Sequence, residues 1–251
     1  MNLIIIQARM GSSRLPGKVL MDIEGKLLLE RLISRIAPRK NEADLIIATT
    51  TLPEDDAIEQ FCKSHGVACY RGSDWDVLDR FYQAAQQYHP LPDHIIRICA
   101  DNPLHSGKVV DFVVDQYFAS GAEYCSNSNH EPNYLEDGFD TEVFSYNALE
   151  KAWKEAKLLS DREHVCPYIK KTVKCFWKKA HPEYQFKLSV DTIMDLNAVR
   201  TIFRELENKP DFSIEEVVQL LKRKPEILEI NKESEINSGL KKSLNEDRIV
   251  K

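Results

Sequence analysis

Short apolar runs alternate with amphipathic stretches through the first half of this chain. Runs typical of buried strands cover residues 3–6, 43–50, 67–70 and 94–101. Stretches with helical spacing lie between and after them, at residues 26–36, 53–66, 76–89 and 107–121. The helix expected after Pro53 carries acids in its first turn and ends at Gly66, as the helix dipole and the C-cap preference favour. Continuous apolar strands separated by helices predict an α/β fold with a parallel sheet covered on both faces.

The second half of the chain is less regular. We expect short strands and a loop over 122–145, a strand over 186–191, and helices over 145–158, 160–171 (interrupted by Pro167), 196–206 and 213–225. Residues after 231 are polar and are expected to form a C-terminal arm, 231–251. Because the sequence shows no internal repeat and no low-complexity linker, we predict a single domain covering residues 1–251.

Composition excludes several classes of protein. A net charge of −6 argues against a nucleic-acid coat or a basic membrane-surface protein. No apolar run reaches the roughly 18–20 residues needed to cross a bilayer, and the first apolar stretch ends at Gln7, too early for a signal peptide. None of the six cysteines forms a CxxC pair or has zinc-ligand spacing with histidine. We therefore expect a cytoplasmic protein with reduced thiols, no nucleic-acid partner and no membrane insertion.

A basic loop follows the first expected strand. Residues 7–18 read QARMGSSRLPGK and bring together Arg9, Arg14 and Lys18 without any acid. Ligands bind beyond the carboxyl ends of parallel strands, so this loop should meet residues 49–51, 71–76 and 100–103. Clustered cations repel one another unless an anion neutralises them. Composition therefore favours a phosphate site, and a solvated basic turn remains the alternative.

The loop differs from a conventional P-loop. Five residues separate Gly11 from Gly17, and Val19 follows Lys18 where that motif has Ser or Thr. The general physics is unaffected, because glycines let backbone N–H groups approach an anion closely.

The order of the residues is more specific than their composition. QARMGSSRLPGKVL resembles the nucleotide-binding signature of the sugar-activating cytidylyltransferases, and it looks most like their spore-coat polysaccharide biosynthesis branch, related to 3-deoxy-manno-octulosonate and acylneuraminate cytidylyltransferases. The resemblance continues through IIATT, RGSDWDVLDRFYQAA, IIRICADNPL, GFDTEVFSYNALEKAW, DREHVCPYI and LSVDT. It implies a three-layer, Rossmann-like nucleotide-diphospho-sugar transferase fold. The sheet would be mixed but mostly parallel, with an acceptor-binding and dimerisation segment inserted at about residues 122–180.

The same resemblance implies a reaction. CTP and a sugar or sugar-acid acceptor would give a CMP-sugar, or a CDP-sugar where the acceptor is a phosphate, plus pyrophosphate for surface glycan biosynthesis. Mg²⁺ dependence and a homodimer are also implied. The expected nucleotide-binding residues are Ala8, Arg9, Gly11, Ser12, Arg14, Lys18, Thr49, Thr50, Arg71, Ser73 and Asp101. The expected catalytic residues among them are Arg9, Arg14, Lys18 and Asp101. The three cations would stabilise the departing pyrophosphate, and Asp101 would hold the metal.

Two aspartates are expected to hold the metal. Asp101 ends the run 94–101, and Asp191 ends the run 186–191. Mg²⁺ prefers oxygen ligands and keeps several waters, so two carboxylates and phosphates suffice. The alternatives are a cap for the helix starting near Ser106 and a turn before Thr192.

The acceptor is expected to meet residues 126–142 and 162–168. The expected acceptor-binding residues are Asp140, Glu142, Arg162, Glu163 and His164. An arginine here could bind a sugar carboxylate or phosphate through two hydrogen bonds. The same composition also suits an ordinary polar loop. Asp140 and His164 are possible general bases, and a binding or structural role is the alternative for each.

Arg80 has two readings. It falls four residues after Asp76 on an expected helix, the spacing of an intrahelical ion pair, so a surface salt bridge competes with a ligand-binding role. Thr49 and Thr50 would position the cytosine or ribose, or would cap the next turn.

Two other classes compete with the transferase hypothesis. A glycosyltransferase of similar fold would use a D-x-D metal motif, which the letters of DWD (74–76) match, although these residues open a helix. A non-catalytic nucleotide-binding protein is the third class. Fold stability alone does not require the combined presence of Arg9, Arg14, Lys18, Asp101 and Asp191, so we favour the enzyme.

Overall fold

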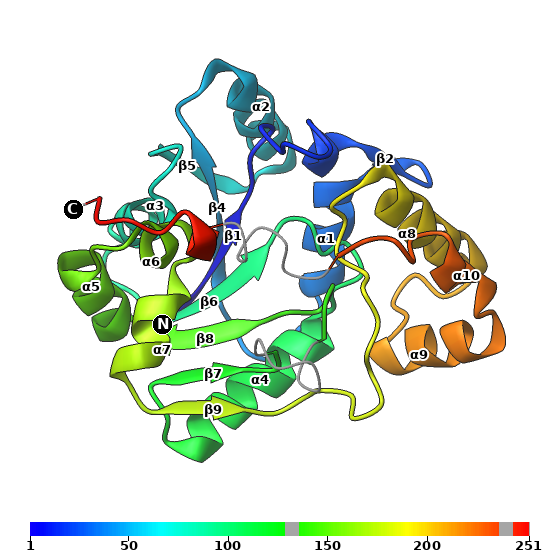
Figure 1. The fold of residues 1–251 in the computed structure, drawn as a ribbon. Helices are drawn as coiled ribbons and strands as arrows, with labels where there is room; N and C mark the ends of the chain where they lie inside the picture. Colours follow the sequence, from blue (N-terminus) through cyan, green and yellow to red (C-terminus); the bar gives the residue numbers. More distant parts are fainter. Residues whose placement is uncertain (129–135, 236–242, 251) are drawn as a thin grey trace.

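A twisted sheet runs through the molecule (Figure 1). The computed structural model describes residues 1–128, 136–235 and 243–250. Within these residues the main sheet has seven strands. In sheet order they are β5 (Ala68–Gly72), β4 (Asp44–Thr50), β1 (Asn2–Gln7), β6 (His94–Cys99), β8 (Glu142–Ser145), β7 (Tyr124–Ser126) and β9 (Cys175–Trp177). A separate hairpin is formed by β2 (Asp22–Ile23) and β3 (Lys26–Leu27).

The strand directions agree with the sequence prediction. β1 pairs in parallel with β4 and β6, and β4 with β5. β8 is antiparallel to both β6 and β7, while β9 is parallel to β7. The predicted α/β fold with a mixed, mostly parallel sheet is therefore confirmed.

Helices cover both faces of the sheet (Figure 1). They are α1 (Leu28–Ile36), α2 (Asp56–His65), α3 (Val77–Ala85), α4 (Gly107–Ser120), α5 (Tyr146–Glu155), α6 (Leu159–His164), α7 (Cys166–Thr172), α8 (Ile193–Glu205), α9 (Ile214–Arg223) and α10 (Glu226–Glu229). Two 3₁₀ turns, η1 (Lys18–Leu20) and η2 (Pro53–Asp55), complete the described helical elements. No helix in these described parts of the chain is long and apolar enough to cross a membrane.

The continuously apolar sequence of β1 is explained by the burial of both of its faces. Leu3 and Ile5 pack in the cluster that includes side chains of α3, α5 and α7. Ile4 and Ile6 point to the opposite face and pack with α1, α2 and α4. Successive side chains of a strand alternate between faces, so a central strand covered on both sides has no solvent-facing position.

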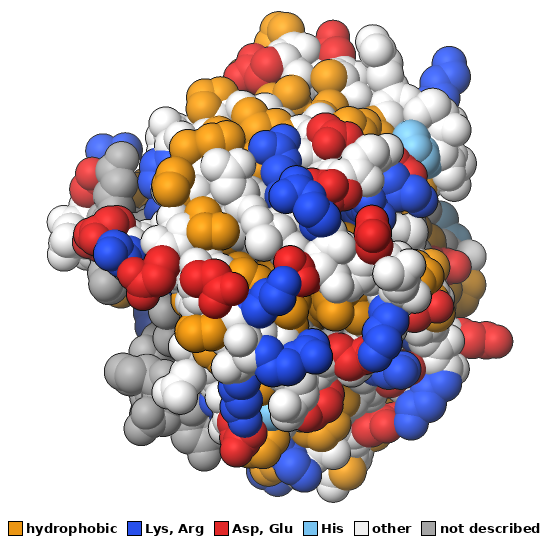
Figure 2. Space-filling view, turned by 90° about the vertical axis from the view of Figure 1, so that its right-hand side faces the viewer, with side chains coloured by type: hydrophobic (Ala, Val, Ile, Leu, Met, Phe, Trp, Pro, Cys, Tyr) orange, Lys and Arg blue, Asp and Glu red, His pale blue; other side chains and the backbone are white. Residues whose placement is uncertain are grey.

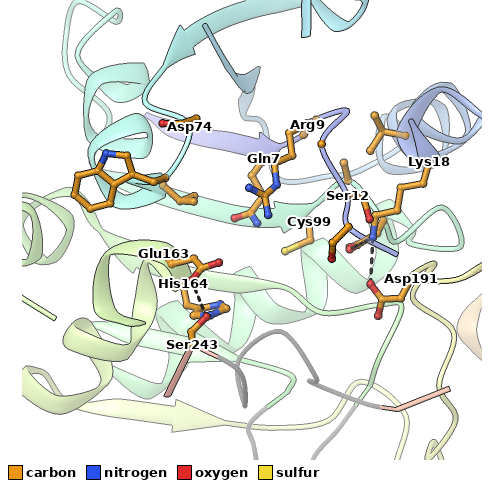
Figure 3. Close-up of a pocket in the computed structure, with 18 of the residues that line it drawn as sticks. Gln7, Arg9, Ser12, Lys18, Asp74, Cys99, Glu163, His164, Asp191 and Ser243 are labelled. Atoms are coloured by element: carbon orange, nitrogen blue, oxygen red, sulfur yellow. Dashed lines mark hydrogen bonds and ion pairs between the residues drawn. The ribbon is translucent and has the colours of Figure 1, made fainter. Parts of the chain in front are cut away.

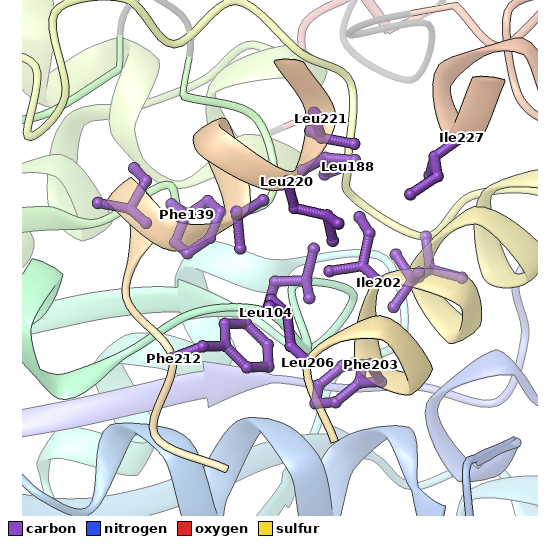
Figure 4. Close-up of a cluster of buried hydrophobic side chains, with 14 of the residues drawn as sticks. Leu104, Phe139, Leu188, Ile202, Phe203, Leu206, Phe212, Leu220, Leu221 and Ile227 are labelled. Atoms are coloured by element: carbon purple, nitrogen blue, oxygen red, sulfur yellow. The ribbon is translucent and has the colours of Figure 1, made fainter. Parts of the chain in front are cut away.

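Helices α8, α9 and α10 form a further layer with its own hydrophobic cluster (Figure 4). Leu104, Phe139 and Leu188 join this cluster from the sheet side. The Arg35 guanidinium of α1 donates to the carbonyls of Leu104 and Phe212 and lies 3.6 Å from the centre of the Phe212 ring. The layer is thereby attached to α1 by apolar packing and by one buried cation.

Charges of both signs are interspersed over the face that Figure 2 presents. Ion pairs on or near the helical layer include Arg204 with Glu24 and Lys224 with Glu205. Such exposed pairs contribute little stability each, so packing is what holds the layer in place.

The predicted strand over 186–191 is wrong. The segment is extended but joins no sheet ladder. The N–H groups of Leu188 and Ser189 donate to the Asp137 carboxylate at 2.8 and 2.6 Å, and Val190 N donates to the Asp101 carbonyl at 2.8 Å. A buried carboxylate therefore satisfies backbone groups that a neighbouring strand would otherwise pair. Strand β9 was not predicted.

The predicted helical interruption falls two residues before Pro167. Val165 lies between α6 and α7 with φ of 67°, and Pro167 occupies the first turn of α7. Proline is tolerated in a first turn because its missing N–H would be unpaired there. The break ends α6 at His164, next to the cavity described below.

A buried charge cluster lies where β6, β7 and β8 meet. The Glu142 carboxylate accepts a hydrogen bond from Tyr124 at 2.6 Å, pairs with Lys170 at 2.9 Å and pairs with Arg97. Burial raises the pKa of Glu142, but Lys170 and Arg97 lower it more strongly, so the pKa lies well below its usual range. A carboxyl with a depressed pKa adds stability above its unfolded pKa of about 4.3, and this stability is lost as the pH falls.

We expect Glu142→Gln to lower the free energy of unfolding at pH 7 by about 3–5 kcal/mol, because it leaves buried cations unpaired. The difference from wild type should shrink below about pH 4, where the wild type loses its own contribution. Urea unfolding at pH 7 and pH 3.5 measures both values. Glu207→Gln, an exposed change, is the control. Equal losses at pH 7 for the two variants would contradict the prediction.

Candidate active site

A cavity of about 700 Å³ opens beyond the carboxyl ends of β1 and β6. The loop after β1, the start of α3, the end of α6 and Asp191 surround it (Figure 3). The residues of the sequence prediction that line it are Ala8, Arg9, Gly11, Ser12, Arg14, Lys18, Asp101, Glu163, His164 and Asp191. Segments far apart in the chain therefore meet where a ligand of a parallel sheet is expected.

The loop after β1 is held in shape from two sides. The carbonyl of Met10 accepts hydrogen bonds from Ser12 N and Gly17 N, both at 2.8 Å. Gly17 has φ of 74°, which suits glycine, and leads directly into η1. The buried Asp55 carboxylate accepts from Met10 N at 2.6 Å and from the N–H and hydroxyl of Thr50. Asp55 thus joins the loop to the end of β4.

The cations of this loop meet two acids at one end of the cavity. Lys18 Nζ lies 2.9 Å from Asp101 Oδ2 and 3.2 Å from Asp191 Oδ1, and it donates to the Val190 carbonyl at 2.6 Å. Arg14 pairs with Asp191 at 2.8 Å. Burial lowers the pKa of Lys18, but Asp101 and Asp191 outweigh it, so the pKa is raised and the ammonium stays charged.

Asp191 is surrounded by cations. Burial alone raises its pKa, but Lys18, Lys187 and Arg14 lower it below its usual value. The Lys187 ammonium lies 3.0 Å from Asp191 Oδ2. The carboxylate therefore remains ionised at neutral pH, as a metal ligand must be.

The two acids have the donor atoms that Mg²⁺ prefers. Asp101 and Asp191 both reach one cationic atom, Lys18 Nζ. Among the described residues, no group of three or more His, Cys, Asp and Glu side chains forms a larger metal site. Mg²⁺ is commonly held by one or two carboxylates together with substrate phosphates. The residues present therefore fit a magnesium ion that is completed by phosphate oxygens.

The other end of the cavity carries a different set of groups (Figure 3). Glu163 and His164 reach it from the end of α6, and Ser243 reaches it from the C-terminal residues. The Ser243 hydroxyl donates to Glu163 Oε2 at 2.6 Å and lies 2.9 Å from His164 Nε2. This end combines carboxylate, hydroxyl and imidazole groups, which suit a polar ligand.

Four predicted nucleotide-binding side chains, those of Thr49, Thr50, Arg71 and Ser73, are not among the described residues that line the cavity. Thr49 and Thr50 are fully buried, and the Thr50 hydroxyl bonds to Asp55. Arg71 donates to the carbonyls of Thr50 and Leu52 and pairs with Asp56 and Glu59. The Ser73 hydroxyl accepts from Asp76 N at 3.1 Å. Local backbone and carboxylate partners engage Thr50, Arg71 and Ser73, so these side chains shape the loops around the cavity, whereas the buried Thr49 hydroxyl has no hydrogen-bond partner in the described part of the chain.

Three predicted acceptor-binding residues are also placed elsewhere. Arg162 is 1% exposed, pairs with Asp76 at 2.6 Å, and donates to two carbonyls of the α5–α6 region. Glu142 belongs to the buried cluster beneath β8. Asp140 accepts from Gly138 N at 3.1 Å, and burial followed by Asp137 raises its pKa to about 7. The part of the predicted acceptor segment at 129–135 lies outside the described residues.

Arg80 is the site residue that the sequence left undecided. Asp76 pairs with Arg162, while Arg80 Nη1 donates to the Ser73 carbonyl at 2.6 Å and the side chain lines the cavity. It is 2% exposed, and burial followed by the nearby Arg9 lowers its pKa to about 10. A signal existed in the sequence, because Arg80 lies on the helix face of the apolar residues Val77 and Ala84.

The chain matches the family model described as cytidylyltransferase over residues 3–236. The chain belongs to the cytidylyltransferase family. Its members are nucleotidyltransferases, so this protein is an enzyme of that class.

Relatives place the enzyme within the family. It is 40% identical over 236 residues to an uncharacterised protein of Methanocaldococcus jannaschii, covering 90% of this chain and 93% of that protein. It is 31% identical over 232 residues to the spore coat polysaccharide biosynthesis protein SpsF of Bacillus subtilis, covering 89% and 95%. A 3-deoxy-manno-octulosonate cytidylyltransferase of Anaeromyxobacter dehalogenans is 32% identical over 112 residues, or 44% of this chain and 45% of that one. The resemblance stated from the sequence motifs is confirmed.

A solved structure confirms the fold. A cytidylyltransferase from Leptospira borgpetersenii superposes with a TM-score of 0.81 at 29% sequence identity, covering 90% of this chain and 96% of that one. The sheet and its helical layers are therefore those of a known nucleotidyltransferase.

Asp55→Asn is expected to loosen the loop after β1, because one charged hydrogen bond to Met10 N is worth about 1.5–3 kcal/mol. Cleavage after the exposed Arg9 and Arg14 by trypsin should become roughly tenfold faster, since local opening controls such cleavage. Peptide mapping over time measures the rate. Asp56→Asn, at the exposed neighbouring position, should leave it unchanged, and equal acceleration in both variants would contradict the role of Asp55.

Proposed function

We propose that this cytidylyltransferase transfers the cytidylyl group of CTP to a hydroxyl of a sugar or sugar acid, with Mg²⁺, for surface glycan biosynthesis. The acceptor oxygen forms a bond to the α-phosphorus while the bond from that phosphorus to the β-phosphate oxygen breaks. Pyrophosphate leaves, and the hydroxyl proton passes to a base or to solvent. The names of the relatives support this acceptor class, since they refer to polysaccharide biosynthesis and to a sugar acid.

The cationic end of the cavity carries the proposal. Arg9, Arg14, Lys18 and Arg80 all line it. A triphosphate would give these cations a further anionic partner and would bring its β- and γ-phosphates to Lys18 and Arg14. Negative charge grows on the leaving pyrophosphate in the transition state, so fixed cations there lower the barrier.

Asp101 and Asp191 are the proposed Mg²⁺ ligands. When bound, the metal would polarise the α-phosphate and favour ionisation of the acceptor hydroxyl. Lys18 and Arg14 would exchange these carboxylates for phosphate oxygens as nucleotide enters. The chain would thereby keep its charges paired both before and after substrate binding.

The acceptor would occupy the end of the cavity that Glu163 and His164 line. The Nε2 nitrogen of His164 lies 2.9 Å from the Ser243 hydroxyl oxygen. An imidazole at this place can orient an acceptor hydroxyl by hydrogen bonding.

The glycosyltransferase alternative is disfavoured by the placement of its D-x-D letters. Asp76 pairs with Arg162 and accepts from Asp79 N, as the cap of α3. Asp74 lines the cavity, whereas Asp76 is committed to these partners. A metal site on both acids would need the buried Arg162 pair to break.

The deciding experiment is pyrophosphate release with Mg²⁺, comparing CTP, UTP, ATP and GTP against 2-keto-3-deoxy sugar acids and sugar phosphates. CTP-specific release with one acceptor would establish both substrates. Calorimetry with CTP and Mg²⁺ on the same sample tests the nucleotide site separately, and a protein that binds no CTP would disprove the proposal.

Asp101→Asn should lower the rate of pyrophosphate release by about 10²–10³-fold, as expected for removing one preorganised charge at the reacting phosphate. Steady-state kinetics in Mg²⁺ measures the loss. The control is Asp115→Asn on the outer face of α4, where the carboxylate meets Lys40. Unchanged turnover in Asp101→Asn would remove Asp101 from the metal site.

Mg²⁺ alone should bind weakly, because Lys18, Arg14 and Lys187 already neutralise the two acids. We expect the affinity for Mg²⁺ to rise at least about tenfold when CTP is present. Calorimetric titration of Mg²⁺ with and without CTP tests this without turnover. Tight binding of the metal alone would show that the lysines do not compete for the acids.

A further inference from the structure

The C-terminal residues form part of the cavity wall. Residues 243–250 run beside α6 (Figure 1), and Ser243 and Glu246 line the cavity. The match to the family model ends at residue 236, so these residues follow the segment that the family comparison covers. Their contribution to the site is a property of this chain's own structure.

Hydrogen bonds anchor this segment on both sides of Leu158. Leu159 N donates to the Arg248 carbonyl at 2.9 Å, and Val250 N donates to the Lys157 carbonyl at 2.8 Å. The Asp247 carboxylate accepts from the N–H and hydroxyl of Ser160 at 3.0 and 2.9 Å. The segment is therefore positioned by backbone pairing and by one carboxylate cap, which fixes where Ser243 and Glu246 lie.

The hydrogen bonds of Ser243 set the chemistry of this wall. Ser243 is 5% exposed, and its single hydroxyl proton goes to Glu163 Oε2 at 2.6 Å, because an ionised carboxylate can only accept. The oxygen of Ser243 then accepts from His164 Nε2, which must carry a proton in this arrangement. Glu163 and Glu246 both line the cavity, so this wall carries two carboxylate side chains.

Such a wall selects for hydrogen-bond donors. Lys18 lies at the other end of the cavity beside Asp191 (Figure 3), where Arg14 also pairs with Asp191, and an anionic group of a ligand would be stabilised by these cations. A carboxylate or phosphate of the acceptor placed against Glu163 and Glu246 would be repelled. Hydroxyl groups and protonated amines are the groups that these acids bind.

We propose that residues 243–250 form an acceptor-recognition wall that binds hydroxyl or ammonium groups on the part of the acceptor remote from the reacting oxygen. The inference rests on the proposed function. It adds that the part of the acceptor remote from the reacting oxygen carries hydrogen-bond donors. Glu246 is the recognition residue, while Ser243, which holds the Glu163 carboxylate, and Asp247 are positioning residues. The Arg162 that was expected to bind an acceptor anion is paired with Asp76, which agrees with a donor-selective wall.

The test compares Ser243→Ala and Glu246→Gln with the control Arg248→Gln, whose side chain is exposed on the same segment. Pyrophosphate release is measured at saturating CTP and Mg²⁺ with 3-deoxy-manno-octulosonate, its terminal-amino analogue and its terminal-deoxy analogue. Ser243→Ala, which releases the Glu163 carboxylate, and Glu246→Gln are the two recognition variants. Each should raise the acceptor KM about tenfold, the effect of losing one hydrogen bond to a charged group. The KM for CTP should stay within about twofold, and Arg248→Gln should change neither value.

The acceptor series distinguishes the two kinds of donor. Recognition of hydroxyls predicts that the deoxy analogue is poor for wild type and that Glu246→Gln removes this discrimination. Recognition of ammonium predicts a preference for the amino analogue that Glu246→Gln abolishes.

Two failures can be told apart. Acceptor KM values unchanged in both recognition variants, or raised equally in Arg248→Gln, would overturn the role of the wall alone. Wild-type protein that turns over none of the three sugars would overturn the acceptor class and this inference together, while calorimetric CTP binding reports separately on the nucleotide site. Thermal unfolding of each variant separates a local effect from loss of the fold.

Discussion

The buried ammonium of Lys18 connects three parts of the chain that are distant in sequence. It binds Asp101 after β6, Asp191 before α8 and the carbonyl of Val190, and it begins η1 at the end of the basic loop. Without this cation, two carboxylates would face each other in a partly buried place at a high electrostatic cost. The ammonium thus joins the basic loop, the end of β6 and the segment 186–191 at one point.

The same interaction explains how a strongly charged cavity can exist before substrate arrives. Cations of the loop and acids of the sheet edge neutralise each other. In the proposed reaction, phosphate oxygens would take the place of the acids beside the cations, and Mg²⁺ would take the place of the cations beside the acids. The charged groups then need little rearrangement when the reaction begins. Preorganisation of this kind is the main way in which fixed charges speed phosphoryl chemistry.

Much of the fold was predictable because its strands are local and continuous. The apolar runs at β1, β4, β5 and β6, and the basic loop between them, follow from periodicity and from residue order. The extended segment 186–191 could not be predicted, because its partner is the carboxylate of Asp137 rather than a strand.

Side-chain partners within the site were also harder to predict, because they too are distant in sequence. Arg162, rather than Arg80, pairs with Asp76. Arg162 therefore has a structural role, whereas Arg80 lines the cavity. A sequence shows the spacing of Asp76 and Arg80 but not a competitor 86 residues away. Likewise, nothing in the C-terminal sequence indicated that Ser243 would meet Glu163 and His164.

The cavity wall takes residues from both extremes of the chain, from Gln7 near the start to Glu246 near the end. During synthesis, the end of the cavity where Lys18 meets Asp101 and Asp191 needs the chain only as far as Asp191, because Lys18 and Asp101 emerge earlier. The opposite end is completed only when Ser243 and Glu246 have also left the ribosome. A prematurely terminated chain could thus retain the sheet and the basic loop, yet its cavity would lack one side.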